Sequence, residues 1–356
     1  MLSKLQQEIV DNDSNVIFVE AAAASGKTAT IVEKIKRELQ ANQGRVVAFT
    51  FTNAAAEEMY DRVGVQDPEK LFIGTIHSYC VQILLAHGID EAIQYCEEQW
   101  FDRLFQLVKK NPECAKPVYC IICDEMQDCN ENQFEFIFDI LEAEKYFCCY
   151  DKRQSIYRWN GAHPEYIDDY AFKKWAEVLT LNENYRNATK ILTFAKNIIG
   201  VAGWDYRDES IPMRGLTGKV TPDVEYNPHQ IARDLAAYNG DYSDWFVLTR
   251  TNDQIDEICR YLKTFGVPYD TFKRSELNNK ELNERMKANT VKVLTIHSAK
   301  GLEANNVIVI GSKFYNLEER CISYVAATRA RNWLIWTKNA NEKKEKYICK
   351  QLGVLI

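Results

Sequence analysis

The segment of small residues at positions 21–28, Ala-Ala-Ala-Ala-Ser-Gly-Lys-Thr, constrains the fold of this chain more than any other stretch. Directly before it, residues 15–20 form an apolar run typical of a short buried strand, and residues 29–36 after it have apolar positions at helical spacing. A strand, a loop of small residues ending in Gly-Lys-Thr and a helix are the setting that a phosphate-binding loop requires. We therefore predict such a loop here, in preference to a solvated turn that merely precedes a helix.

The residue types in this loop suggest what each would do. Small side chains allow backbone N–H groups to curl around phosphate oxygens, and the helix N-terminus adds the positive end of its dipole. These small residues are Ala21, Ala22, Ala23, Ala24, Ser25 and Gly26. Lys27 is expected to reach the β- and γ-phosphates of ATP, and the hydroxyl of Thr28 to bind Mg²⁺. Ala21 stands where the general pattern has its first glycine, and Ala24 adds another Cβ.

Composition places the chain among ordinary globular proteins. Its 356 residues, 46% hydrophobic and 27% charged, are enough for about two domains with a core each. No apolar run is long enough to span a bilayer, and the first residues lack the apolar stretch of a signal peptide. Eleven cysteines in such a chain indicate reduced thiols in a cytoplasm. Because the net charge is −7, a nucleic acid would have to bind a local groove and not a generally basic surface.

Four cysteines between residues 114 and 129 can be interpreted in two ways. Cys120 and Cys123 form a C-x-x-C, and with Cys114 and Cys129 they could hold a metal ion. However, residues 118–123 are an apolar run typical of a strand, in which side chains three positions apart point to opposite faces. We expect buried, unreactive thiols, with a metal site as the alternative.

Short apolar strands alternate with helical segments along the whole chain, and this alternation predicts an α/β fold with parallel, doubly wound sheets. Further strands are expected at residues 45–50, 71–75, 118–123, 146–150, 245–249, 291–296, 306–310 and 333–336. The main helices are expected at residues 79–112, 184–192, 253–265 and 317–331, with an irregular stretch over residues 200–230. We predict two domains, residues 1–178 and 179–356, which abut with a cleft between them. In such folds ligands lie at the carboxyl ends of the strands.

Charged and polar residues that follow the predicted strands indicate phosphate chemistry. Asp124 would hold Mg²⁺ through water, and Glu125 would activate the water that attacks the phosphate. A plain solvated acidic strand end is the alternative. Gln154 is a candidate sensor of the γ-phosphate, and Arg186 and Arg329 are candidates for stabilising the transition state. Each arginine taken alone would be a surface residue in most proteins.

Aromatic residues at the same predicted edge suggest a second ligand. Phe51, Tyr157 and Trp159 follow strands and are interleaved with Thr, Asn and Arg residues. Stacking of bases on aromatic rings is how proteins bind single strands without sequence preference. Aromatic residues of an ordinary core are the alternative interpretation.

Taken together, the motifs resemble those of the UvrD, Rep and PcrA group of superfamily 1 DNA helicases, in the family's order and from Gln6 to about Trp336. The matching segments are residues 6–10, 21–28, 50–59, 74–78, 124–128, 154–162, 184–186, 295–303 and 324–329. The resemblance implies two RecA-like domains with a nucleotide cleft between them, and ATP and Mg²⁺ as ligands. It also implies single-stranded DNA, or a duplex with a single-stranded tail, as the partner, and 3′→5′ polarity of movement.

The resemblance further implies roles for individual residues. Gln6 would read the adenine, Tyr185 would stack under it and Glu303 would contact the ribose. Arg186 and Arg329 would act as arginine fingers. DNA contacts are implied for Thr50, Phe51, Asn53, Thr75, His77, Tyr157, Trp159, Arg250 and His297.

The chain departs from this family at three motif positions and in length. Ala24 replaces the usual loop glycine, Ala29 stands where an arginine near the base is usual, and Asn160 stands in place of an arginine. The family's accessory subdomains are inserted where this chain has only residues 79–117 and 253–290, which are too few to build them. The chain also ends shortly after the last motif, so we expect no fused nuclease.

Two functions from different classes are compatible with the sequence. The first is an ATP-driven motor on single-stranded DNA that acts in replication, repair or recombination. The alternative is a partner-controlled ATPase module of a nuclease or defence complex that is stimulated by DNA but does not unwind processively. Because the accessory subdomains are reduced, we expect unwinding to need a protein partner or self-association.

Overall fold

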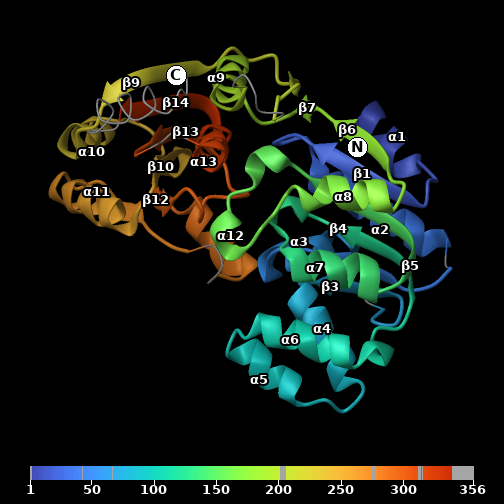
Figure 1. Cartoon of the computed structure of the whole chain (residues 1–356). Coiled ribbons are helices and arrows are strands. Elements are labelled where there is room, and N and C mark those ends of the chain that lie inside the picture. Colours follow the sequence, from blue (N-terminus) through green and yellow to red (C-terminus); the bar gives the residue numbers. More distant parts are fainter. Residues whose placement is uncertain are drawn as a thin grey trace. The chain divides into compact units, whose positions relative to one another are not determined.

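Two compact units make up the structure, residues 1–182 and 183–356. This computed structural model describes residues 2–338, except residues 42, 66, 201–205, 274–276, 312, 313 and 315. Each unit has a sheet of six strands with helices beside it (Figure 1). The predicted α/β class with parallel sheets is confirmed, because every neighbouring pair of strands in both sheets is parallel.

The sheet of the first unit has the strand order β3-β2-β4-β5-β1-β6. Its strands are β1 (Val16–Ala21), β2 (Val46–Phe49), β3 (Leu71–Gly74), β4 (Val118–Cys123), β5 (Ala143–Tyr150) and β6 (Glu177–Leu181). Because they are parallel, their carboxyl ends all lie at one edge of the sheet. Strands β2 and β4 are buried along their whole length, which explains why they are continuous apolar runs in the sequence.

Helices of the first unit complete two hydrophobic cores. The α-helices are α1 (Lys4–Asp11), α2 (Lys27–Ala41), α3 (Asn53–Val63), α4 (Ile76–Leu85), α5 (Glu91–Glu97), α6 (Phe101–Lys110), α7 (Glu131–Glu135) and α8 (Tyr166–Lys173). Ile35 of α2 and Met59 of α3 belong to one core, and Phe105 of α6 belongs to the other. Cys120 lies in the first core and Cys123 in the second, as expected for residues on opposite faces of a strand.

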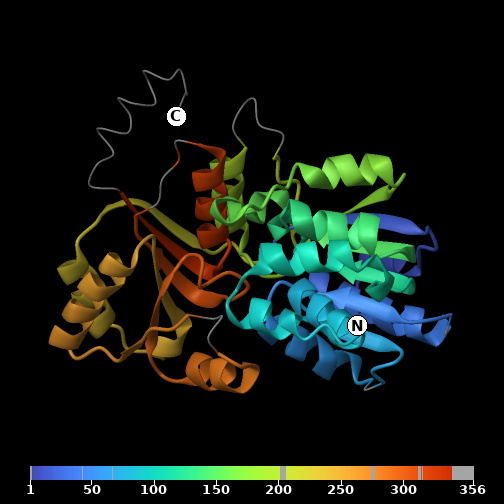
Figure 2. The ribbon, with the colours of Figure 1, turned by 60° about the horizontal axis from the view of Figure 1, so that its bottom comes forward.

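The continuous helix predicted over residues 79–112 is wrong, because the chain breaks there into α4, α5 and α6 (Figure 2). A turn at Gly88, whose φ is +76°, follows α4, and Trp100 has a non-helical conformation before α6. The three helices pack against one another. Apolar residues continue across the breaks, so periodicity alone could not reveal where one helix ends.

The predicted boundary between the units lies a few residues too early. Strand β6 was not expected, and it pairs with β1 so that Leu179 stands beside Val19. The first unit therefore runs to Asn182 instead of residue 178. Residues 339–356 of the predicted second domain lie outside the described residues.

The second unit has a sheet of order β11-β12-β10-β13-β14-β9 and a separate pair, β7 and β8. These strands are β7 (Glu183–Asn184), β8 (Ile211–Pro212), β9 (Lys219–Glu225), β10 (Trp245–Thr249), β11 (Tyr269–Asp270), β12 (Val291–Thr295), β13 (Ala304–Val309) and β14 (Ala330–Lys338). Its α-helices are α9 (Thr189–Ile199), α10 (Pro228–Ala236), α11 (Asn252–Thr264), α12 (Asn279–Lys287) and α13 (Leu317–Ala327).

Two expectations for the second unit need correction. The helix predicted from Asn184 begins only at Thr189, because Asn184 belongs to β7. The stretch predicted to be irregular contains β9, which forms the edge of the sheet and pairs only with β14 among the described strands. An edge strand needs little apolar alternation and tolerates a proline such as Pro222, so its sequence gives a weak signal.

Candidate active site and nucleic-acid interface

The loop of small residues joins β1 to α2 at the carboxyl edge of the first sheet. It turns tightly, since the N–H of Ser25 donates to the carbonyl of Ala22 at 3.2 Å. Ala24 and Gly26 both have left-handed backbones, with φ of +58° and +80°. Glycine adopts this conformation without penalty, whereas a residue with a Cβ is strained there. The alanine that departs from the family pattern therefore costs local stability.

Gln6 of α1 packs directly onto this loop. Its Nε2 donates to the carbonyl of Ser25 at 2.8 Å, and its Oε1 accepts from the N–H of Ser3 at 2.8 Å. A Cβ at Gly26 would lie 2.3 Å from Gln6 Nε2 and would be strained at φ of +80°, so any other residue there would have to displace the Gln6 side chain. Gln6 thus positions the loop, and its implied role in reading adenine stays a prediction.

Lys27, at the start of α2, meets the acidic pair that follows β4. Its Nζ lies 2.7 Å from Glu125 Oε1 and 3.6 Å from Asp124 Oδ1. Burial would lower the pKa of Lys27, but the charges of Glu125 and Asp124 outweigh burial and hold it above its usual range. Burial also raises the pKa of Asp124 to about 6, with the charge of Lys27 opposing the rise. Sequence positions almost a hundred residues apart therefore form one charged cluster.

Glu125 starts a chain of hydrogen bonds that sequence reasoning did not predict. Its backbone is left-handed, with φ of +52°, and its carboxylate accepts from the Nε2 of Gln127. The Oε1 of Gln127 accepts from the N–H of Asp151 at 2.9 Å, and Ser155 Oγ donates to the carbonyl of Gln127 at 3.1 Å. Asp151 Oδ2 in turn accepts from Gln154 Nε2 at 2.8 Å.

This network connects the acid pair to the segment that carries the proposed phosphate sensor. Gln127 and Asp151 are fully buried, and Gln154 is nearly so. The sequence contained a signal for both missed residues, since Gln127 stands inside the matching segment 124–128 and Asp151 directly follows β5. Their positions at two neighbouring strand ends bring them together.

A cavity of 660 Å³ opens beside the acid pair in the first unit. It gathers four segments that follow β2, β3, β4 and β5. The residues expected to contact DNA that line it are Thr50, Phe51, Thr75, His77 and Trp159. Asp124 lines the same cavity and also lies 3.6 Å from Lys27. The candidate ATP site and the candidate DNA site therefore share this carboxylate.

The aromatic rings at this cavity, and Tyr157 which does not line it but contacts two of them, differ in how accessible they are. Phe51 and Tyr157 stack on each other with ring centroids 4.9 Å apart, whereas Trp159 is 71% exposed. His77 stacks on Phe101 of α6 at 3.9 Å, and burial lowers the pKa of His77 to about 4. Phe101 was not predicted to belong to this region. Of these rings, Trp159 is the most exposed, with only an edge-to-face contact to Tyr157 at 6.2 Å between centroids, so it is the best placed for a base to stack on.

The second unit holds the two candidate arginine fingers in contacts of its own. Arg186 pairs with Glu303, which also lies 3.0 Å from Arg331. Burial alone would raise the pKa of Glu303, but the charges of Arg186 and Arg331 hold it below its usual range. Arg329 is 1% exposed and donates to the carbonyl of Val325 at 2.9 Å.

The remaining predicted residues lie on separate elements. Tyr185 is 40% exposed and its hydroxyl donates to Glu183 at 2.9 Å. Arg250 pairs with Glu319 at 2.6 Å. His297 lies in the turn after β12, and Asn53 is the exposed first residue of α3. Asn53, the one of these residues in the first unit, does not line the 660 Å³ cavity.

The four cysteines between residues 114 and 129 are buried thiols. Burial raises the pKa of Cys120 to about 12 and that of Cys123 well above its usual range, which makes both unreactive. Within the described part of the chain, no three His, Cys, Asp or Glu side chains gather as a metal site. No described helix is both long and apolar enough to cross a bilayer.

A phosphate loop whose lysine meets an acid pair at the carboxyl edge of a parallel sheet defines the class of P-loop nucleotide hydrolases. Comparison with known families narrows the class. Residues 2–111 and 99–173 match the UvrD/REP helicase N-terminal domain, and residues 270–341 match the UvrD-like helicase C-terminal domain. The chain belongs to the UvrD-like helicases, a family of ATP-dependent DNA helicases.

Individual relatives agree with this assignment. A probable DNA helicase of Mycoplasma pneumoniae is 24% identical over 94% of this chain and 82% of its own length. Gabija protein GajB of Bacillus cereus is 24% identical over 97% of both chains. ATP-dependent DNA helicase Rep of Escherichia coli is 23% identical over 74% of this chain but only 54% of its own length. The chain thus spans about half of the length of Rep.

Proposed function

We propose that the chain is an ATP-driven motor that moves along single-stranded DNA with 3′→5′ polarity. The observation that carries the proposal is the position of Asp124, which lies beside Lys27 and also lines the cavity of the predicted DNA residues. One carboxylate in both sites allows nucleotide state and DNA occupancy to influence each other directly. The polarity rests on the family resemblance alone.

The residues of the loop fit a nucleotide and a divalent cation. The hydroxyl of Thr28 and the carboxylate of Asp124 are hard oxygen donors, the type that Mg²⁺ prefers. Mg²⁺ supplies positive charge that neutralises the phosphate oxygens of ATP. Lys27 would exchange its contacts with the acid pair for contacts with the β- and γ-phosphates. Glu125, released from Lys27, would then orient the attacking water and accept its proton.

The hydrogen bonds from Glu125 through Gln127 to Asp151 offer a route from hydrolysis to DNA. Asp151 also holds Gln154, the candidate γ-phosphate sensor, by the 2.8 Å contact with its Nε2. Tyr157 follows three residues later and stacks on Phe51. A change in the contacts of Gln154 would therefore be transmitted to the aromatic rings at the cavity.

We further propose that Arg186 and Arg329 of the second unit act on the transition state of hydrolysis. In the structure each is bonded within its own unit, Arg186 to Glu303 and Arg329 to Val325. Reaching a phosphate would require both side chains to leave these partners. Such an exchange would make hydrolysis depend on the second unit as well as the first.

Displacement of streptavidin from biotinylated single-stranded DNA tests movement and polarity together. A 3′→5′ motor should remove streptavidin from the 5′ end in the presence of ATP and leave it on the 3′ end. The Lys27→Ala variant serves as the control without hydrolysis. Release from neither end, despite DNA-stimulated ATPase activity, would contradict the motor.

Unwinding is expected to be weaker than movement. In the described residues, the segments at residues 79–117 and 253–290 form α4 to α6 with a 3-10 turn at Pro112–Cys114, and α11, β11 and α12, and they add no domain to the two units. Each base-pair step resists opening by about 1.4 kcal/mol, so a motor with little grip on the duplex should slip back. In a single-turnover assay with a 3′ tail, one monomer should separate a short duplex and fail on a long one. Efficient separation of the long duplex would contradict this expectation.

A partner-controlled ATPase module of a nuclease or defence complex is the second candidate. The observation in its favour is the match to Gabija protein GajB over 97% of both chains. The match to Rep covers only 74% of this chain and 54% of Rep. Such a module would hydrolyse ATP on DNA but would displace streptavidin only after a partner protein is added. The same displacement assay therefore separates the two functions.

A further inference from the structure

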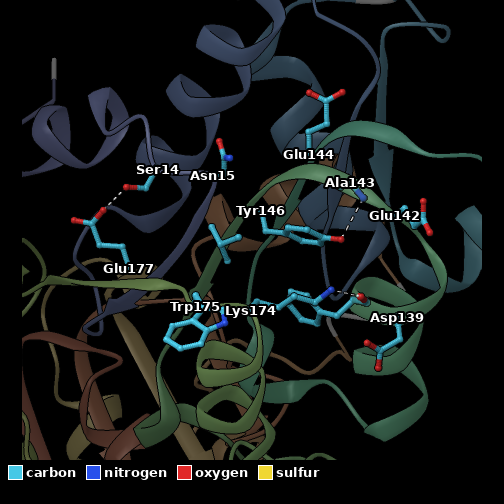
Figure 3. Close-up of a pocket in the computed structure, with 12 residues that line it drawn as sticks. Ser14, Asn15, Asp139, Glu142, Ala143, Glu144, Tyr146, Lys174, Trp175 and Glu177 are labelled. Carbon is cyan, nitrogen blue, oxygen red and sulfur yellow. Dashed lines mark hydrogen bonds between the residues drawn. The ribbon is translucent and has the colours of Figure 1, made fainter.

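A second cavity, of 780 Å³, opens at the opposite edge of the first sheet (Figure 3). Val16, Ala143 and Glu177 line it, and they are the first residues of β1, β5 and β6. A strand of six residues spans roughly 20 Å, so this amino-end pocket lies about that far from the phosphate loop at the other end of β1. It is separate from the candidate ATP and DNA sites.

Two large aromatic side chains stand exposed beside the amino-end pocket. Phe172 near the end of α8 is 80% exposed, and Trp175, which lines the pocket, is 87% exposed. Their rings stack with centroids 6.1 Å apart. Val178 on the edge strand β6 is also exposed, at 54%. Contiguous exposed apolar side chains of this size are typical of interaction surfaces.

The backbone conformation at Trp175 is one that disfavours a tryptophan. The φ of Trp175 is +54°, and Ala176 N–H donates to the carbonyl of Ala171 at 2.9 Å, which is the turn that ends many helices. Glycine is usual at this position, because a bulky residue is strained in the left-handed conformation. Neither burial nor local geometry within the first unit favours Trp175, so its ring is available for another molecule.

The rim of the pocket is acidic. Glu142, Glu144, Asp139 and Glu177 line it together with one cationic side chain, Lys174. Lys174 donates to the backbone carbonyl of Phe138 at 2.6 Å, and Asp139 already pairs with Lys173 at 2.7 Å. Figure 3 shows the side chains of Glu142 and Glu144 on either side of Ala143. This charge repels the phosphates of nucleic acids and attracts basic side chains.

We propose that the amino-end pocket and the Phe172–Trp175 pair form a docking surface for an extended segment of a partner protein. The segment would carry a lysine or arginine, facing Glu142 and Glu144, between apolar side chains that cover the aromatic pair. An extended conformation fits because β6 is the edge strand of its sheet. Docking there would leave the phosphate loop and the aromatic cavity free for ATP and DNA.

Selection from a phage-displayed library of random twelve-residue peptides, with the full chain immobilised, tests this proposal. Selected peptides should combine lysine or arginine with apolar residues. Synthetic versions should bind wild type in fluorescence anisotropy and lose at least tenfold in affinity for a Phe172→Ser/Trp175→Gly variant. A Glu142→Lys/Glu144→Lys variant should show a similar loss. Ile93→Ser, which removes an exposed apolar residue on α5, is the matched control and should bind like wild type.

The variants are chosen so that unfolding cannot explain the result. Glycine relieves the strained backbone at Trp175, so the melting temperature of Trp175→Gly should equal or exceed that of wild type. ATPase activity should also be unchanged. Failure to select any peptide, acidic peptides, or equal affinity for the double variant would overturn the proposal. A wild-type dimer that becomes a monomer in the double variant would overturn it in favour of a second copy, and weaker single-strand binding would do so in favour of DNA.

Discussion

Lys27 Nζ lies 2.7 Å from Oε1 of Glu125, so the side chain assigned to the phosphates is paired with the side chain assigned to the attacking water. In this state neither group can perform its proposed task. Binding of ATP would have to separate them, and the negative charge of the phosphates can replace that of Glu125 beside Lys27. The ion pair therefore occupies both side chains until nucleotide binds.

Substitutions of this pair should separate binding from turnover. Glu125→Gln keeps the shape of the side chain but removes the base, so ATP should still bind while hydrolysis stops. Lys27→Ala should abolish hydrolysis, because no other residue of the loop carries a charge to the phosphates. Nucleotide binding by fluorescence and phosphate release measure the two steps. Turnover at the wild-type rate in Glu125→Gln would show that another group activates the water.

Ala24→Gly should stabilise the protein. An alanine in the left-handed conformation costs about 1–2 kcal/mol relative to an unstrained residue, and glycine avoids most of this cost. The gain is reduced by the greater freedom of glycine in the unfolded chain, so we expect a net increase of about 1 kcal/mol in the free energy of unfolding. Urea denaturation measures it. Ala22→Gly is the matched control within the same loop, since Ala22 is not among the residues with positive φ.

Trp159→Ala should weaken binding of single-stranded DNA by about 1–3 kcal/mol, with little dependence on base identity. The reason is the exposure of its ring at the cavity, which leaves it free to stack. Phe51→Ala and Tyr157→Ala should have smaller effects on affinity, because their rings stack on each other before DNA arrives. Anisotropy titrations with labelled oligonucleotides at moderate salt measure this. Unchanged affinity in Trp159→Ala would place the bases elsewhere.

Arg186→Ala and Arg329→Ala should lower kcat far more than they weaken ATP binding. Arginine fingers contribute roughly 10³–10⁵ in rate where they act on the transition state. Arg329 is also buried, so its loss should reduce stability, and Arg329→Lys serves as a control that keeps a positive charge. Steady-state kinetics and melting temperatures distinguish the two effects. Near-normal kcat in both alanine variants would exclude the fingers.

His77 should make stability depend on pH. Its pKa is lowered by burial from the usual 6.5 to about 4, so below pH 6.5 the unfolded chain binds a proton that the folded chain does not. The free energy of unfolding should therefore fall as the pH drops from 6.5 to 4, by up to about 3 kcal/mol. His77→Phe preserves stacking on Phe101 and removes the titration. The difference in stability between wild type and His77→Phe should vary over this range, and a constant difference would contradict the lowered pKa.

The local sequence determined the loop, the acid pair and most strands, because each depends on contiguous residues. Ala21 to Thr28 between an apolar run and a helical pattern could form little else, and Val118–Cys123 is apolar throughout because both of its faces are buried. The edge strands β6 and β9 were not predicted, because they are not buried on both faces. Their outer sides are exposed, so their residues are mixed and give no clear periodicity.

Tertiary structure alone decided which distant residues meet. The parallel register of β4 and β5 places Gln127 beside Asp151, and this contact joins Glu125 to the segment of Gln154. A glutamine or an aspartate in the sequence does not by itself predict such a link, because the role of a buried amide or carboxylate depends on the group to which it is hydrogen-bonded. The sequence thus determined which chemical groups stand at the strand ends. The sheet order decided their neighbours, because strands adjacent in space are far apart along the chain.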